Sequence, residues 1–220
     1  MYDYTLGLKI HNLLEEHNLE NPVDFTQVAA WNDPEYLASL EAKFGAFMAQ
    51  LGLYRNPAEL PRSAQRLVDF YTAERFSGLD YRKFPQVKTI SNEFGYTEPL
   101  IARDIRLAST CEHHLVPITG KVLIAYIPQQ YLVGLNKLNQ IVEFFAQRPQ
   151  LQERLTRQLL VVFQELLGTL NIAVVINAQH NCINSGGIQN DASLHSTYQL
   201  AGTFATDLCL KAQILTYLGT

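Results

Sequence analysis

Two clusters of cysteine and histidine, far apart in the sequence, constrain the fold of this chain more than any other feature. The first cluster holds Cys111, His113 and His114, and the second holds His180 and Cys182. Thiolates combined with imidazole favour zinc, and three protein ligands would leave one position for water, which is typical of catalytic zinc sites. A fold that serves this chemistry must bring the two clusters together.

The spacing alone leaves the choice of ligands open. Cys111 and His114 are three residues apart, so one turn can present both to a single ion. His180 and Cys182 are two apart and would share one side of a regular strand. A closed structural site with four ligands, or unrelated buried residues, would fit the same spacing, although the CxxC pairs of ordinary structural sites are absent. If only three groups bind, at least one histidine remains for proton transfer.

The composition argues against several classes of protein. The net charge is −4, so no basic surplus indicates binding to nucleic acid. The N-terminus lacks a signal-peptide pattern and no apolar run is long enough to cross a bilayer, which predicts a cytoplasmic protein without membrane contact. Three widely spaced cysteines argue against a disulfide framework. One of them, Cys209, lies between two leucines and is expected to be a small buried residue.

The first part of the chain carries a helical pattern. Asp33 can cap a helix that begins at Pro34. Ser63 is a candidate cap for the next helix. We therefore predict an N-terminal helical segment over residues 1–85, followed by a second domain over residues 86–220.

After residue 86 the pattern changes to the order β-β-α-α-β-β. The residues predicted to lie on one side of the first strand are Ile101, Arg103, Ile105 and Leu107. Two hairpins that flank a helix pair indicate an α+β domain, with an antiparallel four-stranded sheet and two helices on one face. So small a sheet has open edges, and pairing of these edges between subunits would make an oligomer.

Several ordered motifs resemble the GTP cyclohydrolase I family, from about residue 60 to the C-terminus. They are Phe76-Ser77-Gly78-Leu79-Asp80-Tyr81, Ser109-Thr110-Cys111-Glu112-His113-His114, Ala125-Tyr126-Ile127-Pro128, Gly134-Leu135-Asn136-Lys137, Gln152-Glu153-Arg154-Leu155-Thr156 and His180-Asn181-Cys182. The resemblance implies a tunnelling-fold catalytic domain over residues 86–220. In that fold, subunits join their sheets into a ring and two rings stack into a homodecamer, which agrees with the open edges of the expected sheet.

For the metal site, the resemblance implies that Cys111, His114 and Cys182 bind zinc. His113 and His180 match the histidines that transfer protons. The family hydrolyses the imidazole ring of the guanine of GTP, releases formate and forms 7,8-dihydroneopterin triphosphate. Zinc suits this reaction because it lowers the pKa of its bound water.

For the substrate site, the resemblance implies a purine nucleotide. Gln152 and Glu153 match the residues that hold the guanine, and a carboxylate suits the N–H edge of that base. Lys137 and Arg66 match phosphate contacts. Asn136 stands where the family has a serine that takes part in the late ribose rearrangement.

Four positions on the triphosphate side depart from the family pattern. Asn136 replaces the serine, and Asp69 replaces a residue that is usually basic. Gln140 and Gly186 each replace an arginine. Charge-assisted contacts are worth roughly 1.5–3 kcal/mol each, so these changes are expected to weaken GTP binding unless other residues compensate.

Two alternatives to an ordinary GTP cyclohydrolase I follow from these departures. One is a divergent paralogue that opens the purine ring of a less phosphorylated substrate, or that stops at the formamide intermediate. The other is a non-catalytic ring subunit that binds a purine or a pterin. The intact zinc and proton-transfer positions speak against the second alternative, because a structural subunit would not need His113 and His180.

Overall fold

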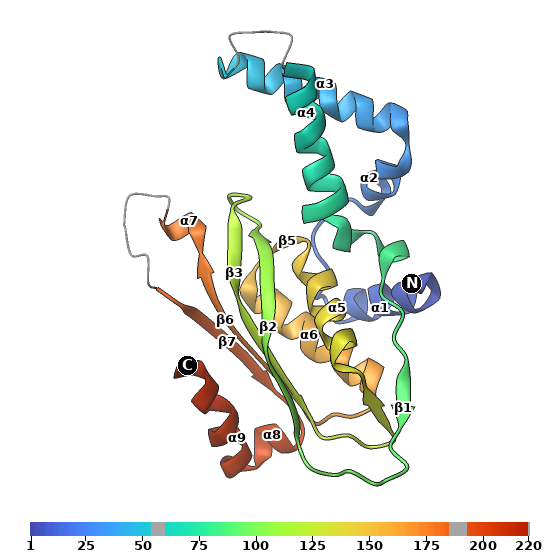
Figure 1. Ribbon diagram of the computed structural model, residues 1–220, viewed down its shortest axis with the longest axis vertical. Coiled ribbons are helices and arrows are strands. Elements are labelled where there is room, and N and C mark those ends of the chain that lie inside the picture. The colour runs from blue at the N-terminus through green and yellow to red at the C-terminus, as the bar shows by residue number, and fades with distance from the viewer. Residues whose placement is uncertain (54–59, 185–192, 220) are drawn as a thin grey trace.

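An antiparallel meander of four strands lies at the centre of the structure (Figure 1), a computed structural model that describes residues 1–53, 60–184 and 193–219. A short fifth strand pairs in parallel with the end of the first, which gives the order β5-β2-β3-β6-β7, and two further strands pair separately. The strands are β1 (Thr89–Ser91), β2 (Leu100–Cys111), β3 (Pro117–Tyr126), β4 (Tyr131–Val133), β5 (Pro149–Gln150), β6 (Ile172–His180) and β7 (His195–Leu200).

Helices precede the sheet, connect its two hairpins and follow it. The α-helices are α1 (Tyr4–Glu16), α2 (Phe25–Ala29), α3 (Pro34–Gln50), α4 (Leu60–Asp69), α5 (Leu135–Ala146), α6 (Gln152–Leu167), α7 (Asn181–Asn184), α8 (Thr203–Thr206) and α9 (Leu208–Leu215). The 3₁₀-helical turns are η1 (Ala30–Asn32), η4 (Ser77–Leu79), η5 (Tyr81–Lys83) and η6 (Thr216–Gly219), and η3 (Phe70–Arg75) is a π-helical segment. Among the described residues, no helix combines the length and the apolar character needed to span a membrane.

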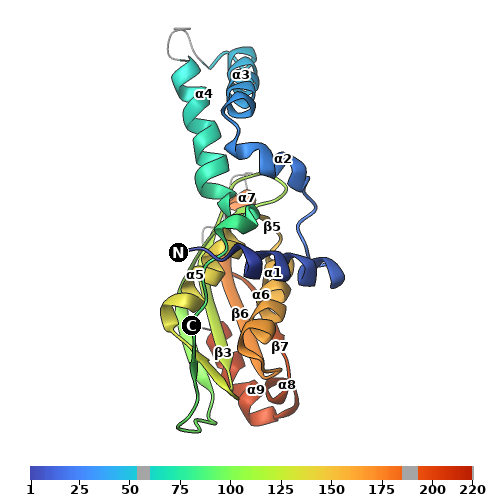
Figure 2. The same cartoon turned by 90° about the vertical axis from the view of Figure 1, so that its right-hand side faces the viewer.

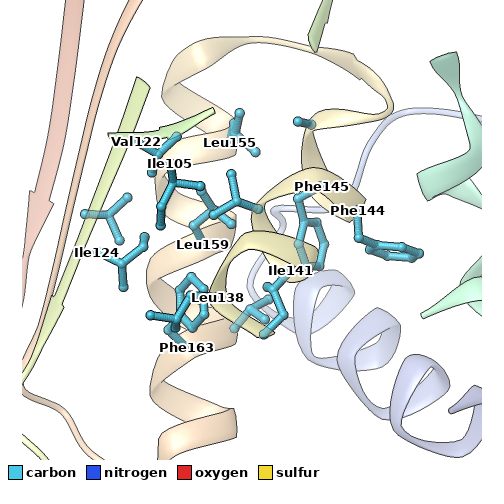
Figure 3. Close-up of a cluster of buried hydrophobic side chains, with 14 of the residues drawn as sticks. Ile105, Val122, Ile124, Leu138, Ile141, Phe144, Phe145, Leu155, Leu159 and Phe163 are labelled. Carbon is cyan, nitrogen blue, oxygen red and sulfur yellow. The ribbon is translucent and has the colours of Figure 1, made fainter. Parts of the chain in front are cut away.

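The main core lies between the sheet and the helix pair α5 and α6, which cover one face (Figures 1 and 2). Phe145 from α5, Leu159 from α6 and Ile124 from β3 all belong to this core, and all three are fully buried (Figure 3). The helical spacing of apolar residues in the sequence therefore predicted the buried faces of α5 and α6 correctly. The predicted α+β fold, with an antiparallel sheet and two helices on one face, is confirmed.

The N-terminal helix α1 also belongs to this core. Ile10 and Leu14 are fully buried in the same cluster as α5 and α6. By contrast, α3 and α4 pack against each other and extend beyond the sheet as an arm (Figures 1 and 2). The division into residues 1–85 and 86–220 stays a prediction.

The opposite face of the sheet carries a smaller apolar layer that the sequence pattern did not predict. Phe204 of α8 and Ile214 of α9 pack there with Leu123 and Val175 of the central strands. Cys209 lies in the first turn of α9 but is exposed, so the prediction that it is buried is wrong. The flanking leucines suggested burial, but only one side of this short helix faces the sheet and Cys209 lies on the other side.

A bulge in β2 corrects the predicted facing of that strand. Asp104 adopts a left-handed φ of 60°, and the register with β3 shifts between Ala102 and Ile105. As a result, Ala102 packs with the α5–α6 core together with Ile105, whereas Ile101 packs on the opposite face. The prediction that Ile101 and Arg103 share a side with Ile105 is therefore wrong, because the extra residue reverses the alternation.

The helix starts were predicted with mixed success. The Asp33 carboxylate accepts a hydrogen bond from the Glu35 backbone N–H at 2.9 Å, and Pro34 is the first residue of α3, as predicted. Ser63 lies inside α4, so its prediction as a cap is wrong.

The backbone at Gly78 lies very close to α5. A Cβ atom at this position would lie 1.8 Å from the Phe144 carbonyl oxygen, so the position requires glycine.

Candidate metal centre

Three potential ligands from the two sequence clusters meet at one end of the sheet. The Sγ atoms of Cys111 and Cys182 and a ring nitrogen of His114 all lie within 4.8 Å of one another. Cys111 is buried, Cys182 is half-buried and His114 is exposed, so the group opens to solvent on the histidine side. Two thiolates and one imidazole form a donor set that suits zinc.

Two backbone hydrogen bonds in the turn between β2 and β3 explain the positions of Cys111 and His114. β2 ends at Cys111, whose backbone N–H donates to the Val116 carbonyl at 2.8 Å. The Leu115 N–H in turn donates to the Cys111 carbonyl at 2.9 Å, and Leu115 adopts a left-handed φ of 53°. This tight turn into β3 holds His114 beside Cys111.

The register of β3 with β6 brings in the third ligand. Ile118, next to the start of β3, lies opposite His180, the last residue of β6. Cys182 then lies on the helical turn α7 rather than on a continued strand. The expectation that a regular strand carries His180 and Cys182 on one side is therefore wrong, although Cys182 does reach Cys111.

His180 is held by Gln152, the first residue of α6. The His180 Nε2 lies 2.7 Å from Gln152 Oε1, and the Gln152 side chain is only 2% exposed. The Gln152 amide N–H₂ faces three acceptors, which are the Ile176 carbonyl at 3.1 Å, the His195 carbonyl at 2.9 Å and the Thr197 hydroxyl at 3.1 Å. This network orients Oε1 as the acceptor, so His180 carries its proton on Nε2 and leaves Nδ1 free as a base.

Partial burial lowers the pKa of His180, and the nearby His195 ring, 5.5 Å away between centroids, lowers it further. Glu153 opposes this shift. Because desolvation dominates, the neutral ring is favoured near pH 7. His113, the other predicted proton-transfer residue, is exposed, and its ring centroid lies 6.3 Å from that of His114.

An ion pair that the sequence analysis did not predict joins the ligand turn to α6. Arg154 donates to the Glu112 carboxylate, with the Nη1 contact at 2.7 Å, and both side chains are largely buried. The signal for this pair was weak, because each residue lies in a recognised motif but nothing in the sequence pairs the two. The pair fixes the start of α6 beside the turn that carries His114.

The predicted substrate residues divide into two groups. Glu153 is exposed in the first turn of α6, next to Gln152 and therefore near His180. Arg66 is exposed on α4, in the arm beyond the sheet (Figure 1). Asp69 is also exposed, at the end of that helix. Gly186, with the Gly186-Gly187 turn, lies outside the described residues.

Lys137 and Asn136 belong to the first turn of α5, at the far end of that helix from the ligands. Ala146, at the other end of α5, accepts a hydrogen bond from Ser109 of β2 at 2.7 Å. The helix rises 1.5 Å per residue, so Lys137 lies roughly 14 Å from Ala146 along the axis. The Lys137 ammonium donates to the Gln140 side-chain oxygen at 2.9 Å. One chain therefore does not bring Lys137 to Cys111.

Comparison with known proteins gives consistent matches. A sequence model described as GTP cyclohydrolase I matches residues 40–219. A GTP cyclohydrolase 1 from Tolumonas auensis is 40% identical over 206 residues, covering 94% of this chain and 94% of that protein. The GTP cyclohydrolase 1 of Edwardsiella ictaluri is 42% identical, covering 94% of this chain and 92% of that protein. The GTP cyclohydrolase 1 of Aeromonas salmonicida is 41% identical, covering 95% and 94% respectively.

Proposed function

The chain belongs to the GTP cyclohydrolase I family, and we propose on this premise that it hydrolyses the guanine imidazole ring of GTP, releasing formate and forming 7,8-dihydroneopterin triphosphate. The observation that carries the proposal is the convergence of Cys111, His114 and Cys182 within 4.8 Å. His180, already oriented by Gln152, lies at the same end of the sheet.

The three converging side chains fit zinc as the resident metal. Two thiolates and one imidazole leave one coordination position for water, as in catalytic zinc sites. When bound, zinc supplies Lewis-acid chemistry and lowers the pKa of a coordinated water. Cys111 is buried at the end of β2, whereas His114 is exposed, so a substrate would approach from the histidine side.

Two histidines beside the ligands are proposed to move protons. His180 would accept a proton at Nδ1, because its Nε2 donates to Gln152. His113, exposed beside His114, would serve a second proton transfer from the solvent side. Neither role requires either side chain to bind the metal.

The guanine is proposed to lie at the start of α6. The exposed Glu153 carboxylate would accept hydrogen bonds from the N–H edge of the base. Gln152 would contribute through its backbone N–H, which lies in the first helical turn and has no partner within the helix. Its side chain already serves His180 and three other groups.

The phosphate residues are proposed to reach the site from neighbouring subunits of a homo-oligomer, with two stacked rings forming a decamer. Lys137 and Asn136 lie at the end of α5 remote from the ligands, so a neighbouring chain is proposed to bring these two residues to the nucleotide bound at Cys111. Among the described residues, β7 pairs only with β6 and so offers an open edge. Arg66 lies on the arm, which also exposes large apolar side chains, among them Phe47 and Leu51. We further propose a cytoplasmic location, which keeps thiolate ligands reduced.

A less phosphorylated substrate is the second candidate, favoured by one contact. Lys137 donates to the neutral Gln140 at 2.9 Å, where a second cation would strengthen phosphate binding. If GTP is the substrate, Gln140→Arg is expected to lower the KM for GTP roughly 10-fold or more, because a charge-assisted hydrogen bond is gained. Steady-state kinetics would measure this change.

The control is Gln213→Arg, which makes the same change of charge at an exposed position on α9. It is expected to leave the KM unchanged. If Gln140→Arg also left the KM unchanged, this position would not limit triphosphate binding, and the argument for a second candidate would lose its support.

The proposed function is tested by incubating zinc-loaded protein with GTP, GDP, GMP or guanosine, while formate and pterin fluorescence are followed separately. Neopterin triphosphate formed from GTP is the expected result. Faster turnover of GDP, GMP or guanosine would support the second candidate, and formate without pterin would indicate arrest after ring opening. No turnover of any of the four would contradict the proposal and leave a binding role.

A further inference from the structure

A fully buried arginine lies between the N-terminal segment and the helix pair. Arg148, just after α5, is 0% exposed. Its Nη1 donates to Glu20 Oε1 at 3.0 Å, to the Tyr81 hydroxyl at 3.2 Å and to Asn21 Oδ1 at 3.4 Å. Removing a charge from water is costly unless it is paired, so Glu20, with a side chain 8% exposed, is its necessary partner.

The rest of the guanidinium is held by aromatic rings. Its Nε and Nη2 find no hydrogen-bond partner in the part of the chain that the structure describes. Its central carbon lies 4.8 Å from the Tyr81 ring centroid, 4.9 Å from that of Phe144 and 4.5 Å from that of Phe145. Such cation–π contacts compensate part of the lost hydration. Burial raises the pKa of Tyr81, so its hydroxyl stays protonated and donates to Glu20.

The N-terminal segment reaches the same place through a second set of contacts. Asn21 donates from Nδ2 to the Pro149 carbonyl at 2.6 Å. Gln158 of α6 donates to the Leu19 carbonyl at 2.7 Å and to Asn21 Oδ1 at 3.2 Å. Residues 19–21 are thus fixed to β5 and to α6 by buried hydrogen bonds.

β5 connects this network to a candidate metal ligand through the backbone, and α6 approaches the same turn through the Arg154–Glu112 ion pair. In its parallel pairing with β2, Pro149 lies opposite Thr110, and Gln150 lies opposite Cys111. The Gln150 carbonyl accepts from the Glu112 N–H at 3.1 Å, directly after the ligand. Side chains also hold β5, because Asn21 donates to the Pro149 carbonyl. The buried Gln150 amide donates to the Phe145 carbonyl and to Gln158 Oε1, each at 2.8 Å.

We propose that Glu20 and Asn21 are positioning residues for the metal centre: through Arg148 and β5 they hold the Cys111 end of β2 in the geometry that binds zinc. The inference rests on the proposed metal centre but adds to it a dependence on the N-terminal segment. Removing a direct hydrogen-bond partner of a metal ligand typically changes metal affinity by about 10–100-fold. Glu20 and Asn21 act one step further from the ligand, so the lower end of that range is expected for them.

The test compares the zinc affinity of full-length wild type, Glu20→Gln and Asn21→Ala, measured by competition with a chromophoric chelator. The visible spectrum of the cobalt-substituted proteins reports ligand geometry separately. Both variants are expected to bind zinc roughly 10-fold or more weakly and to show altered cobalt spectra. Asn21→Ala keeps the Glu20–Arg148 ion pair, so it decides the matter if Glu20→Gln does not fold.

The matched control is Glu165→Gln. It breaks the ion pair of Glu165 with Lys9, which joins α1 to α6 at the surface, away from β5. Zinc affinity is expected to be unchanged in this variant. If Glu20→Gln and Asn21→Ala lost thermal stability yet bound zinc with wild-type affinity and spectrum, the network would be ordinary core and the inference overturned. A wild type that binds no zinc would overturn the proposed metal centre itself, and with it this inference.

Discussion

Replacing Cys182 by alanine is expected to abolish zinc binding and formate release together. Cys182 supplies one of three donor atoms that lie within 4.8 Å of one another, and two remaining ligands do not make a stable catalytic site. The loss of zinc affinity should therefore be far larger than the roughly 10–100-fold loss that follows removal of a residue that only orients a ligand. Metal analysis of the purified variant, with formate measured on the same sample, would give both numbers.

The control for Cys182→Ala is the replacement of a second free cysteine, Cys209, by alanine. Cys209 is exposed in the first turn of α9, so Cys209→Ala removes a thiol of the same kind without touching the centre. It should keep wild-type zinc content and activity. A Cys182→Ala variant with a full zinc complement would mean that the ligand assignment is wrong.

Replacing His180 by alanine is expected to lower kcat by about 10²–10⁴-fold while zinc remains bound. His180 lies two residues before a ligand, but its Nε2 is occupied by Gln152, and its proposed role is to accept a proton at Nδ1. The loss should therefore appear in turnover and not in metal content. Steady-state kinetics and metal analysis on the same sample distinguish the two.

His17→Ala provides the comparison for this prediction. His17 is an exposed histidine after α1 whose ring bonds only to the Leu13 carbonyl at 2.8 Å among the hydrogen bonds of the described residues. Its replacement should change neither quantity. Wild-type kcat in His180→Ala would remove His180 from the mechanism, and loss of zinc in that variant would make it a ligand instead.

The sequence predicted the repeating parts of the fold well because their signals are periodic. The apolar residues of α5 and α6 recur at helical spacing, and those that face the sheet are buried, such as Ile141 and Leu159. Single-residue events were not predictable in this way. Asp104 adopts a left-handed conformation, which the pattern of apolar residues does not predict. Because of the resulting bulge, Ile101 and Ile105 lie on opposite faces of the sheet.

Buried polar groups were the second class that the sequence did not reveal. An arginine just after a helix, such as Arg148, is usually exposed at the surface. Arg148 is instead fully buried, and Glu20, which is distant in sequence, pairs with its charge. Gln152 is still predicted to help hold the guanine, but nothing in the sequence indicated that its side chain also binds His180. Glu20 and His180 reach these side chains only through tertiary packing, so the local sequence around Arg148 and Gln152 does not indicate either contact.

The candidate site was predicted in its residues but not in its geometry. The chemistry of the two clusters indicated a metal site, and the family resemblance gave Cys111, His114 and Cys182 as its ligands. Their meeting depends on the β2–β3 turn and on the register that places Ile118 opposite His180. Those are properties of the whole sheet.

The proposed catalytic zinc centre is best tested by titrating zinc into the metal-free protein and measuring formate release from GTP after each addition. We expect the metal-free protein to release no formate, and we expect activity to rise in proportion to added zinc and to level off at a single zinc per chain. Formate release at the full rate by the metal-free protein would show that the reaction does not depend on zinc.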